Sequence, residues 1–294
     1  GQEISDMTFG LRYCNTGPYV DPVRAVELAE AAEEAGFESL WTVEHTVVPK
    51  GYQPNYPYAE GGRMAGGTED IDLPDPLIWM AYVAARTSRI KLATGILILP
   101  QHKPVHVAKQ VATLDHMAGG RIVLGVGVGW MPEEFRALDA PFEARGPVTD
   151  EAIRALRRLW ADSPVEFHGE HIRFDPLYCE PRPPKRHVPI VVGGHSKAAA
   201  RRAGRLGDGF FPARGAPIDL IDLARKTAEE SGRDPASVEI TVSMPEDPKE
   251  LDGLVRLGVG RVTVPVSAMA GLKSALRGPE DALAWKPLIE EWAG

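Results

Sequence analysis

The sequence predicts a closed (β/α)8 barrel, the TIM-barrel architecture, built as one α/β domain. Short runs rich in β-branched residues alternate with longer amphipathic stretches about eight times along the 294 residues. The turns between them are short, as is usual where helices join parallel strands. A doubly wound open sheet is the alternative, but such a sheet seldom contains eight units of this regularity.

The first half of the chain shows clear helix signals. Asp21 and Pro22 supply an N-cap and a first helical position, and Gly36 ends that helix. Strands are predicted at 8–13, 37–43, 90–97 and 121–126, and helices at 22–35, 76–86, 104–117, 133–138 and 149–160.

The second half continues the alternation after one interruption. Residues 165–174 predict a hairpin with its turn at Gly169–Glu170, as an excursion outside the barrel before strand five. No linker divides the chain, so residues 7–294 form one predicted domain, and residues 1–6 are interpreted as a tag remnant. Strands are predicted at 189–192, 208–211, 238–242 and 261–264, and helices at 196–205, 219–230, 248–257 and at the end of the chain near Trp292.

Composition excludes several classes of function. The net charge of −8, without long runs of either sign, argues against nucleic acid as a partner. Cys14 and Cys179 belong to no CxxC pattern, which argues against a disulfide framework or a structural zinc site. The sequence has no apolar run of about 18 residues and no signal-peptide pattern. We therefore expect a cytoplasmic protein that does not enter a membrane.

The loop at residues 47–74 is unusually long and rich in glycine and proline. It leaves the carboxyl end of the second strand, and active sites of such barrels lie at that end of the strands. Long loops of this kind commonly cover binding sites. We interpret it as a lid on the substrate side, with a passive insertion as the alternative.

The second strand ends in Glu44 and His45. A carboxylate and an imidazole at this position can contact a cofactor ring or move a proton near neutral pH. The alternative is that both residues only cap the loop.

Glycines mark the ends of the third and fourth strands. Gly95 interrupts an apolar strand, which indicates a bulge or a close backbone approach. Gly125, Gly127 and Gly129 share one strand face, and their missing side chains are interpreted as space for a flat ligand. Tight packing inside the barrel is the alternative. Because Trp130 follows, the run does not match the GxGxxG fingerprint.

The fifth strand ends in Gly193-Gly194-His195-Ser196, and a helix follows directly. Two glycines and a serine N-cap leave several N–H groups at the positive end of a helix dipole, which favours phosphate binding. An ordinary turn with a helix cap is the alternative. Asp208 precedes the next strand at the opposite end of the barrel and is interpreted as structural.

The residues that other classes of barrel enzyme need for catalysis are mostly absent from the predicted strand ends. The end of the first strand carries no His or carboxylate, and Pro104 lies between His102 and His106, so no metal site is predicted. No strand ends in Lys for Schiff-base chemistry. A glycoside hydrolase on a barrel stays open as an alternative. Its candidate carboxylates, each of which can equally open a helix, are Glu133, Glu246 and Asp247.

These motifs together resemble the bacterial luciferase-like monooxygenases, and most closely the branch that uses the deazaflavin coenzyme F420. The resemblance covers almost the whole chain, and the motifs recur in order at strand ends. They are Trp41-Thr42-Val43-Glu44-His45, Ala93-Thr94-Gly95-Ile96, the run from Gly125 to Trp130, Gly193-Gly194-His195-Ser196, the segment from Ala203 to Gly209, and Arg145-Gly146 with Asp150-Glu151.

The resemblance implies a cofactor across the barrel mouth, with its phosphate at Gly193 and Gly194. It also implies a non-prolyl cis peptide near Gly95–Ile96 behind the cofactor ring, and a homodimer. Trp130 stands where some deazaflavin dehydrogenases have Glu, which removes an acid from that strand. The implied cofactor-binding residues are Thr94, Gly95, Ile96, Gly127, Gly129, Trp130, Gly193, Gly194, His195 and Ser196.

The resulting expectation is an F420-dependent oxidoreductase that transfers a hydride between reduced deazaflavin and a small organic substrate. His45 is the expected proton relay or ring contact, Glu44 its orienting partner, and Trp130 a wall for the ring or substrate. An FMN-dependent luciferase-like monooxygenase is the first alternative. A protein that binds the cofactor without catalysis is another.

Overall fold

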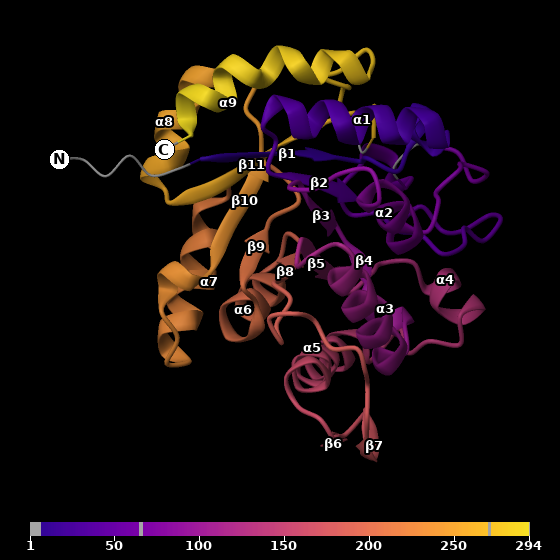
Figure 1. Ribbon diagram of the computed structural model, residues 1–294. Coiled ribbons are helices and arrows are strands. Elements are labelled where there is room, and N and C mark those ends of the chain that lie inside the picture. The colour runs from indigo at the N-terminus through magenta and orange to yellow at the C-terminus, as the bar shows by residue number, and fades with distance from the viewer. Residues whose placement is uncertain (1–6, 65–66, 270–271, 294) are drawn as a thin grey trace.

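The computed structural model describes residues 7–64, 67–269 and 272–293. The predicted tag remnant at 1–6 lies outside these residues. Parallel strands close into a barrel in which β1 pairs with β11 on one side and β2 on the other, and β3 pairs with β5 (Figure 1). The predicted (β/α)8 barrel is confirmed. Its strands are β1 (Thr8–Arg12), β2 (Ser39–Thr42), β3 (Lys91–Thr94), β5 (Ile122–Gly127), β8 (Ile190–Gly193), β9 (Gly209–Phe211), β10 (Glu239–Ser243) and β11 (Val259–Pro265).

Helices surround the barrel and begin where the sequence supplies caps. The Asp21 side chain accepts hydrogen bonds from the N–H groups of Val23 and Arg24, and Gly36 ends the first helix with a φ of 96°. The α-helices are α1 (Pro22–Ala35), α2 (Pro76–Ala84), α3 (Pro104–Met117), α4 (Pro132–Ala137), α5 (Arg145–Ala161), α6 (Lys197–Leu206), α7 (Ile218–Glu230), α8 (Leu251–Arg256) and α9 (Lys286–Trp292). Short 3-10 helices lie at Gly17–Val20, Glu60–Gly62, Leu99–Gln101, Pro235–Ser237, Pro248–Glu250 and Pro279–Trp285.

Two boundaries differ from the sequence prediction. Helix α5 begins at Arg145 and not at Thr149, because Pro147 lies in the first turn, where proline costs no backbone hydrogen bond. The third predicted strand is interrupted after β3, and the chain resumes pairing with β5 as β4 (Leu97–Ile98).

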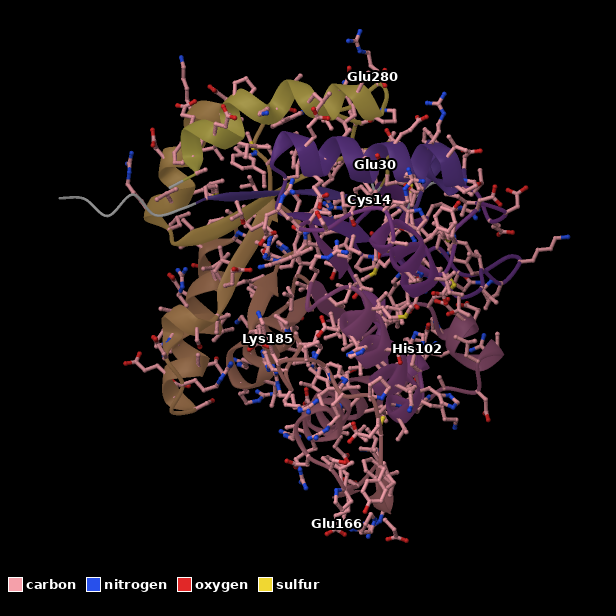
Figure 2. All side chains as sticks on the ribbon, viewed as in Figure 1. Cys14, Glu30, His102, Glu166, Lys185 and Glu280 are labelled. Carbon is pink, nitrogen blue, oxygen red and sulfur yellow. The ribbon has the colours of Figure 1, made fainter. Side chains whose placement is uncertain are left out.

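The predicted hairpin is formed by β6 (Val165–His168) and β7 (Arg173–Leu177). It projects from the molecule on the side away from α1 and α9 (Figure 1), and Glu166 lies at its far end (Figure 2). Residues of its inner side pack against the main core. The hairpin is therefore an excursion outside the barrel, remote from the strand ends that carry the site.

Side chains fill the inside of the barrel. Trp41, Val123, Val191 and Phe211 form an inner cluster with Ala93, separate from the larger core between strands and helices. The edge of Phe211 meets the Trp41 ring at a centroid distance of 5.4 Å. The interior is thus packed, as in other barrels of this type, and a ligand site must lie above it at the strand ends.

An ion cluster centred on the buried Arg261 lies on the amino-terminal side of the inner cluster. Arg261 is 2 % exposed and contacts Glu38 at 2.7 Å and Glu239 at 2.6 Å. Asp208 also acts structurally, as expected, because its carboxylate accepts hydrogen bonds from the N–H of Ile190 and from Arg157. In the ranges that the structure describes, no helix has the length and apolar character needed to cross a membrane.

Candidate functional site

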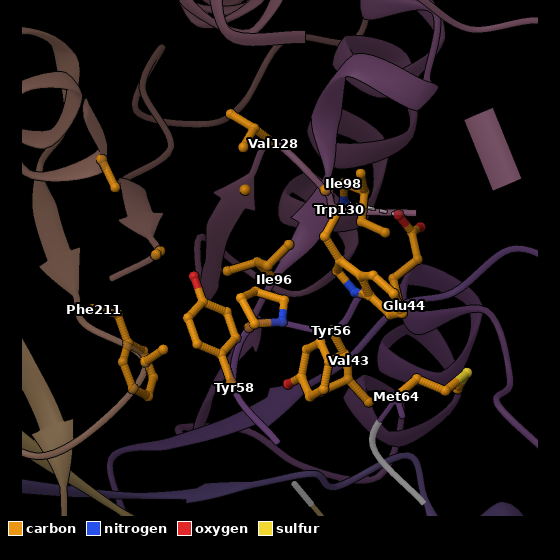
Figure 3. A pocket seen from close by; sticks show the side chains of 18 of the residues that line it. Val43, Glu44, Tyr56, Tyr58, Met64, Ile96, Ile98, Val128, Trp130 and Phe211 are labelled. Atoms are coloured by element: carbon orange, nitrogen blue, oxygen red, sulfur yellow. Dashed lines mark hydrogen bonds between the residues drawn. The ribbon is translucent and has the colours of Figure 1, made fainter. Parts of the chain in front are cut away.

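A cavity of about 1380 Å³ opens at the carboxyl ends of the barrel strands. Figure 3 shows Ile96 near its centre, with Phe211 on one side and Trp130 and Glu44 on the other. Tyr58 lies beside Ile96 and comes from the 47–74 loop. The volume exceeds that of an ordinary single-ligand pocket, so it can hold a large cofactor together with a substrate.

The Ile96 side chain occupies space that side chains at two of the site glycines would need. The peptide between Gly95 and Ile96 is cis, as the family resemblance implied. A Cβ atom on Gly127 would lie 2.5 Å from Ile96 Cδ1, and one on Gly193 would lie 2.6 Å from Ile96 Cγ2. The two glycines therefore allow Ile96 to occupy the floor of the cavity.

The glycine face of β5 is a correction to the sequence interpretation. A Cβ atom on Gly125 would overlap the carbonyl oxygen of Thr94, and one on Gly129 would lie 2.7 Å from Phe135. Protein atoms thus fill the space that was interpreted as room for a flat ligand. Close packing against the backbone of Thr94 and the side chains of Ile96 and Phe135 explains these glycines, although Gly127 and Gly129 line the cavity.

Two predicted cofactor contacts are not among the described residues that line the cavity. Thr94 is fully buried below the floor, where its hydroxyl donates to the carbonyl oxygen of Gly125 at 2.7 Å. The ring of His195 accepts a hydrogen bond from the N–H of Arg214. Burial and the nearby Arg214 charge lower the pKa of His195. The remaining predicted positions, including Glu44 and His45, do line the cavity.

Glu44 is not the partner of His45, which corrects the second expectation. Its carboxylate accepts a hydrogen bond from the N–H of Ile98 and lies 2.9 Å from Nε2 of His102. Burial alone would lower the pKa of His102, but the hydrogen bond and negative charge of Glu44 raise it. Glu44 therefore connects the segment that follows β2 to the end of β4 and to His102, which precedes α3.

The partner of His45 is Glu134, on α4. Nδ1 of His45 lies 2.9 Å from Oε1 of Glu134, whose side chain is completely buried. Glu134 also accepts hydrogen bonds from the side chain of Gln101 and the N–H of Val47. Since Nδ1 is occupied, Nε2 is the nitrogen that His45 can offer to a ligand.

Sequence reasoning missed Glu134 and considered its neighbour Glu133. Both stand in the first turn of a short helix, where acidic residues are common for reasons of capping alone. Helical rotation turns Glu134 inward, while Oε1 of Glu133 accepts a hydrogen bond from the N–H of Gln53. The only signal in the sequence was the charged pair itself.

The start of α6 has the expected features of an anion site. Ser196 accepts a hydrogen bond from the N–H of Ala199, and Gly194 has a φ of 132°. The first N–H groups of a helix have no acceptor within it, so they can donate to a ligand. Arg145 and Arg202 line the same cavity, and Arg202 is itself paired with Asp150.

The described part of the 47–74 loop lies against the cavity. Tyr56 packs on Trp130 with a centroid distance of 5.1 Å. The Tyr58 hydroxyl accepts a hydrogen bond from the N–H of His195, and Arg214 donates to the Tyr58 carbonyl oxygen. Burial raises the pKa of Tyr56, consistent with a ring enclosed at the mouth.

Within 7–64, 67–269 and 272–293, no group of three or more His, Cys, Asp or Glu side chains could hold a metal ion. The site therefore consists of a large cavity, a buried His–Glu pair, an apolar floor and a helix start. These features suit binding, orientation and proton transfer around an organic cofactor.

Comparison with known proteins identifies the family. The family described as luciferase-like monooxygenase matches residues 7–245. An F420-dependent glucose-6-phosphate dehydrogenase of Kineococcus radiotolerans is 31% identical over 271 residues, covering 88% of this chain and 73% of the relative. The corresponding enzyme of Gordonia bronchialis is 33% identical over 243 residues, covering 78% and 67%.

Solved structures share the architecture. A monooxygenase, RslO1, from Streptomyces bottropensis matches with a TM-score of 0.62 and 27% identity, covering 86% of this chain and 75% of that one. The coenzyme F420-dependent tetrahydromethanopterin reductase of Methanopyrus kandleri shares the fold, with a TM-score of 0.70 and 17% identity over 95% and 96% of the two chains. The chain belongs to the luciferase-like monooxygenase family and is an oxidoreductase.

Proposed function

We propose that this protein is an F420-dependent oxidoreductase that transfers a hydride between reduced deazaflavin and a small organic substrate. The observation that carries the proposal is one cavity in which the Ile96 floor lies between a helix start suited to phosphate and a buried His–Glu pair. The two relatives named as F420-dependent dehydrogenases support the choice of cofactor.

The residues of the cavity fit this cofactor by their chemistry. A deazaflavin has a flat ring and an anionic, phosphate-bearing tail. Ile96 would support the ring, and the first turn of α6, which begins beside Gly193 and Gly194, would bind the phosphate. Arg145 and Arg202 would add positive charge there.

His45 is proposed to transfer a proton to or from the substrate, with Glu134 as its partner. When bound, a reduced deazaflavin supplies a hydride, so the protein has to supply or accept one proton at the substrate. His45 would transfer it at Nε2, and the buried Glu134 carboxylate at Nδ1 would orient the ring and stabilise its protonated form. Glu44 has no direct part in this step, because it is bound to His102.

Trp130 is proposed to close the site against water. The edges of the His45 and Tyr52 rings pack on its indole, and Tyr56 packs on it from the loop. This aromatic wall stands where an acid would be in some deazaflavin dehydrogenases. An enclosed, apolar wall favours hydride transfer over loss of the hydride to solvent.

FMN-dependent monooxygenation is the second candidate. It is supported by the similarity to the monooxygenase structure from Streptomyces bottropensis, and the same cavity and helix start would suit the FMN phosphate. The two candidates differ in their need for oxygen.

An anaerobic turnover experiment separates them. Purified protein is mixed with reduced F420 and a panel of small organic acceptors without oxygen, and cofactor oxidation is followed. We expect oxidation that depends on an acceptor and falls by about 100-fold in His45→Ala, as expected for loss of a general acid. Full turnover in His45→Ala would contradict the role of His45. Turnover only with reduced FMN and oxygen would favour the monooxygenase.

A further inference from the structure

Arg12 ends β1 and lines the cavity. Its guanidinium lies 4.4 Å from the centroid of the Tyr13 ring and 5.1 Å from that of Phe211. Nη1 donates to the hydroxyl of Ser243 at 3.0 Å. Two aromatic contacts and one hydrogen bond thus fix the orientation of a long side chain that would otherwise be mobile.

The charge of Arg12 is not neutralised by the protein. Among the described residues, no carboxylate lies within ion-pair distance of its guanidinium, whereas Arg63 is paired with Glu69 and Arg202 with Asp150 in the same cavity wall. Guanidinium has five N–H donors, and one of them reaches Ser243. The others are available to a ligand in the cavity.

The backbone beside Arg12 is also specialised. Tyr13 has a φ of 64°, a conformation that is uncommon for a bulky residue and that concentrates at functional sites. The Tyr13 ring is 5 % exposed and lies against the Arg12 guanidinium. The chain therefore keeps an unfavourable backbone geometry where it supports the Arg12 side chain.

Arg12 stands across the barrel mouth from the α6 helix start. The strand order runs β1-β2-β3-β5-β8 in one direction and β1-β11-β10-β9-β8 in the other, so β1 and β8 face each other. The Arg12 side chain extends from β1 toward β9 and β10, where its guanidinium contacts Phe211 and Ser243. An anion bound at Arg12 would therefore share the cavity with a phosphate bound after β8, but would be held by residues of other strands.

We propose that Arg12 binds the carboxylate or phosphate of the substrate, so that the substrate is a small organic anion. This inference rests on the proposed function for the identity of the reaction. A planar guanidinium held on its faces by aromatic rings presents its N–H edge, which matches the two oxygens of such a group. Ser243 supports the side chain in that orientation.

The test uses a matched pair of probes, phenylacetate and phenylacetamide, titrated into the cofactor-free protein by calorimetry. We expect the wild type to prefer the charged probe by about tenfold, the size expected for a charge-assisted hydrogen bond. Arg12→Met should reduce this preference several-fold, with the α6 helix start and Arg145 left as the other attraction for an anion, and Arg12→Lys should keep more of it than Arg12→Met. Arg63→Met is the control for a cavity arginine that already has a partner, and should keep the full preference.

A wild type with no preference for the charged probe would overturn the proposal, and so would an Arg12→Met variant that keeps the full preference. If circular dichroism shows that Arg12→Met does not fold, Ser243→Ala replaces it. We expect this variant to show a preference reduced by a few-fold, because the Arg12 guanidinium loses its hydrogen bond to the Ser243 hydroxyl. An unchanged preference in Ser243→Ala would then count against the proposal.

The anion could also belong to the cofactor tail, so F420 affinity is measured for the same variants. Unchanged F420 binding in Arg12→Met supports a substrate contact, and a loss as large as that for phenylacetate overturns it. A wild type that binds phenylacetate in an Arg12-dependent way but does not bind F420 would contradict the proposed function while leaving the anion site intact.

Discussion

The proposed proton transfer depends on a single contact between two side chains, His45 and Glu134. The two groups are 2.9 Å apart, and the Glu134 side chain is inaccessible to solvent. A buried carboxylate of this kind can set the tautomer of a histidine and stabilise its charged form. Its effect should therefore appear in turnover and not in cofactor affinity.

Glu134→Gln tests this contact because it keeps the shape of the side chain and removes its charge. We expect turnover with reduced F420 to fall by about tenfold or more, with F420 affinity unchanged, since the proton step loses its support. Glu133→Gln is the matched control from the same helical turn and should stay near wild-type turnover. Equal turnover in both variants would show that His45 acts without Glu134.

The pair of His102 and Glu44 makes a prediction about stability and pH. The pKa of His102 is raised in the folded protein above its ordinary value of 6.5, because the hydrogen bond and charge of Glu44 outweigh the effect of burial. The stabilising contribution of the pair is fully present below the unfolded pKa and is lost as pH rises through the folded pKa.

His102→Gln should therefore cost more stability at about pH 6 than at about pH 9. The measurement is the free energy of unfolding in urea for wild type and variant at both pH values. A cost that is the same at both values, or that grows at alkaline pH, would mean that the charge on His102 does not contribute to the pair.

Glycine allows neighbouring strands to pack closely below the cavity. The carbonyl oxygen of Thr94 on β3 occupies the position that a Cβ atom of Gly125 on β5 would need. Backbone atoms cannot move aside as a side-chain end can, so the barrel depends on glycine here.

We expect Gly125→Ala to lower the free energy of unfolding by about 1–3 kcal/mol or more, the cost of overpacking a dense core. Gly253→Ala is the control on α8, where a Cβ atom meets no other atom within 4 Å. That change should stabilise the protein by up to about 1 kcal/mol, because alanine favours helices. Equal effects in denaturant titrations would contradict the packing explanation.

Elements were predictable from the sequence where their signals are local. Helix α3 begins at Pro104 and ends before Gly119 and Gly120, and both ends match the prediction. The interruption of the third strand at Gly95 was predictable as a bulge, but the point at which pairing resumes depends on β5.

The position of the site was predictable from the sequence, but the contacts between its side chains were not. Parallel strands bring their carboxyl ends together, so Glu44, His45 and Gly193 reach one cavity. The pairing of His45 with Glu134 depends on how α4 rotates against the barrel, which no local pattern records. Arg12 was not predictable, because a single arginine at the end of a strand has no local pattern that distinguishes a ligand contact from a solvent-exposed charge.

In the whole molecule, the residues that stabilise the barrel and the residues that line the cavity lie at different levels along the barrel axis. The inner cluster around Trp41 and the ion cluster at Arg261 fill the barrel, and the cavity lies above them. The cavity lining contains arginines and glutamates, and Arg12 and Arg145 are among those arginines that have no ion pair within the described residues. These two side chains favour an anionic ligand in a chain whose net charge is −8.

The most direct test of F420-dependent function is a titration of the purified protein with coenzyme F420 and, separately, with FMN, followed by fluorescence quenching. We expect tight binding of F420 and much weaker binding of FMN, with F420 affinity reduced by Gly194→Val at the α6 start. Preferential binding of FMN, or binding of neither cofactor, would contradict F420-dependent function.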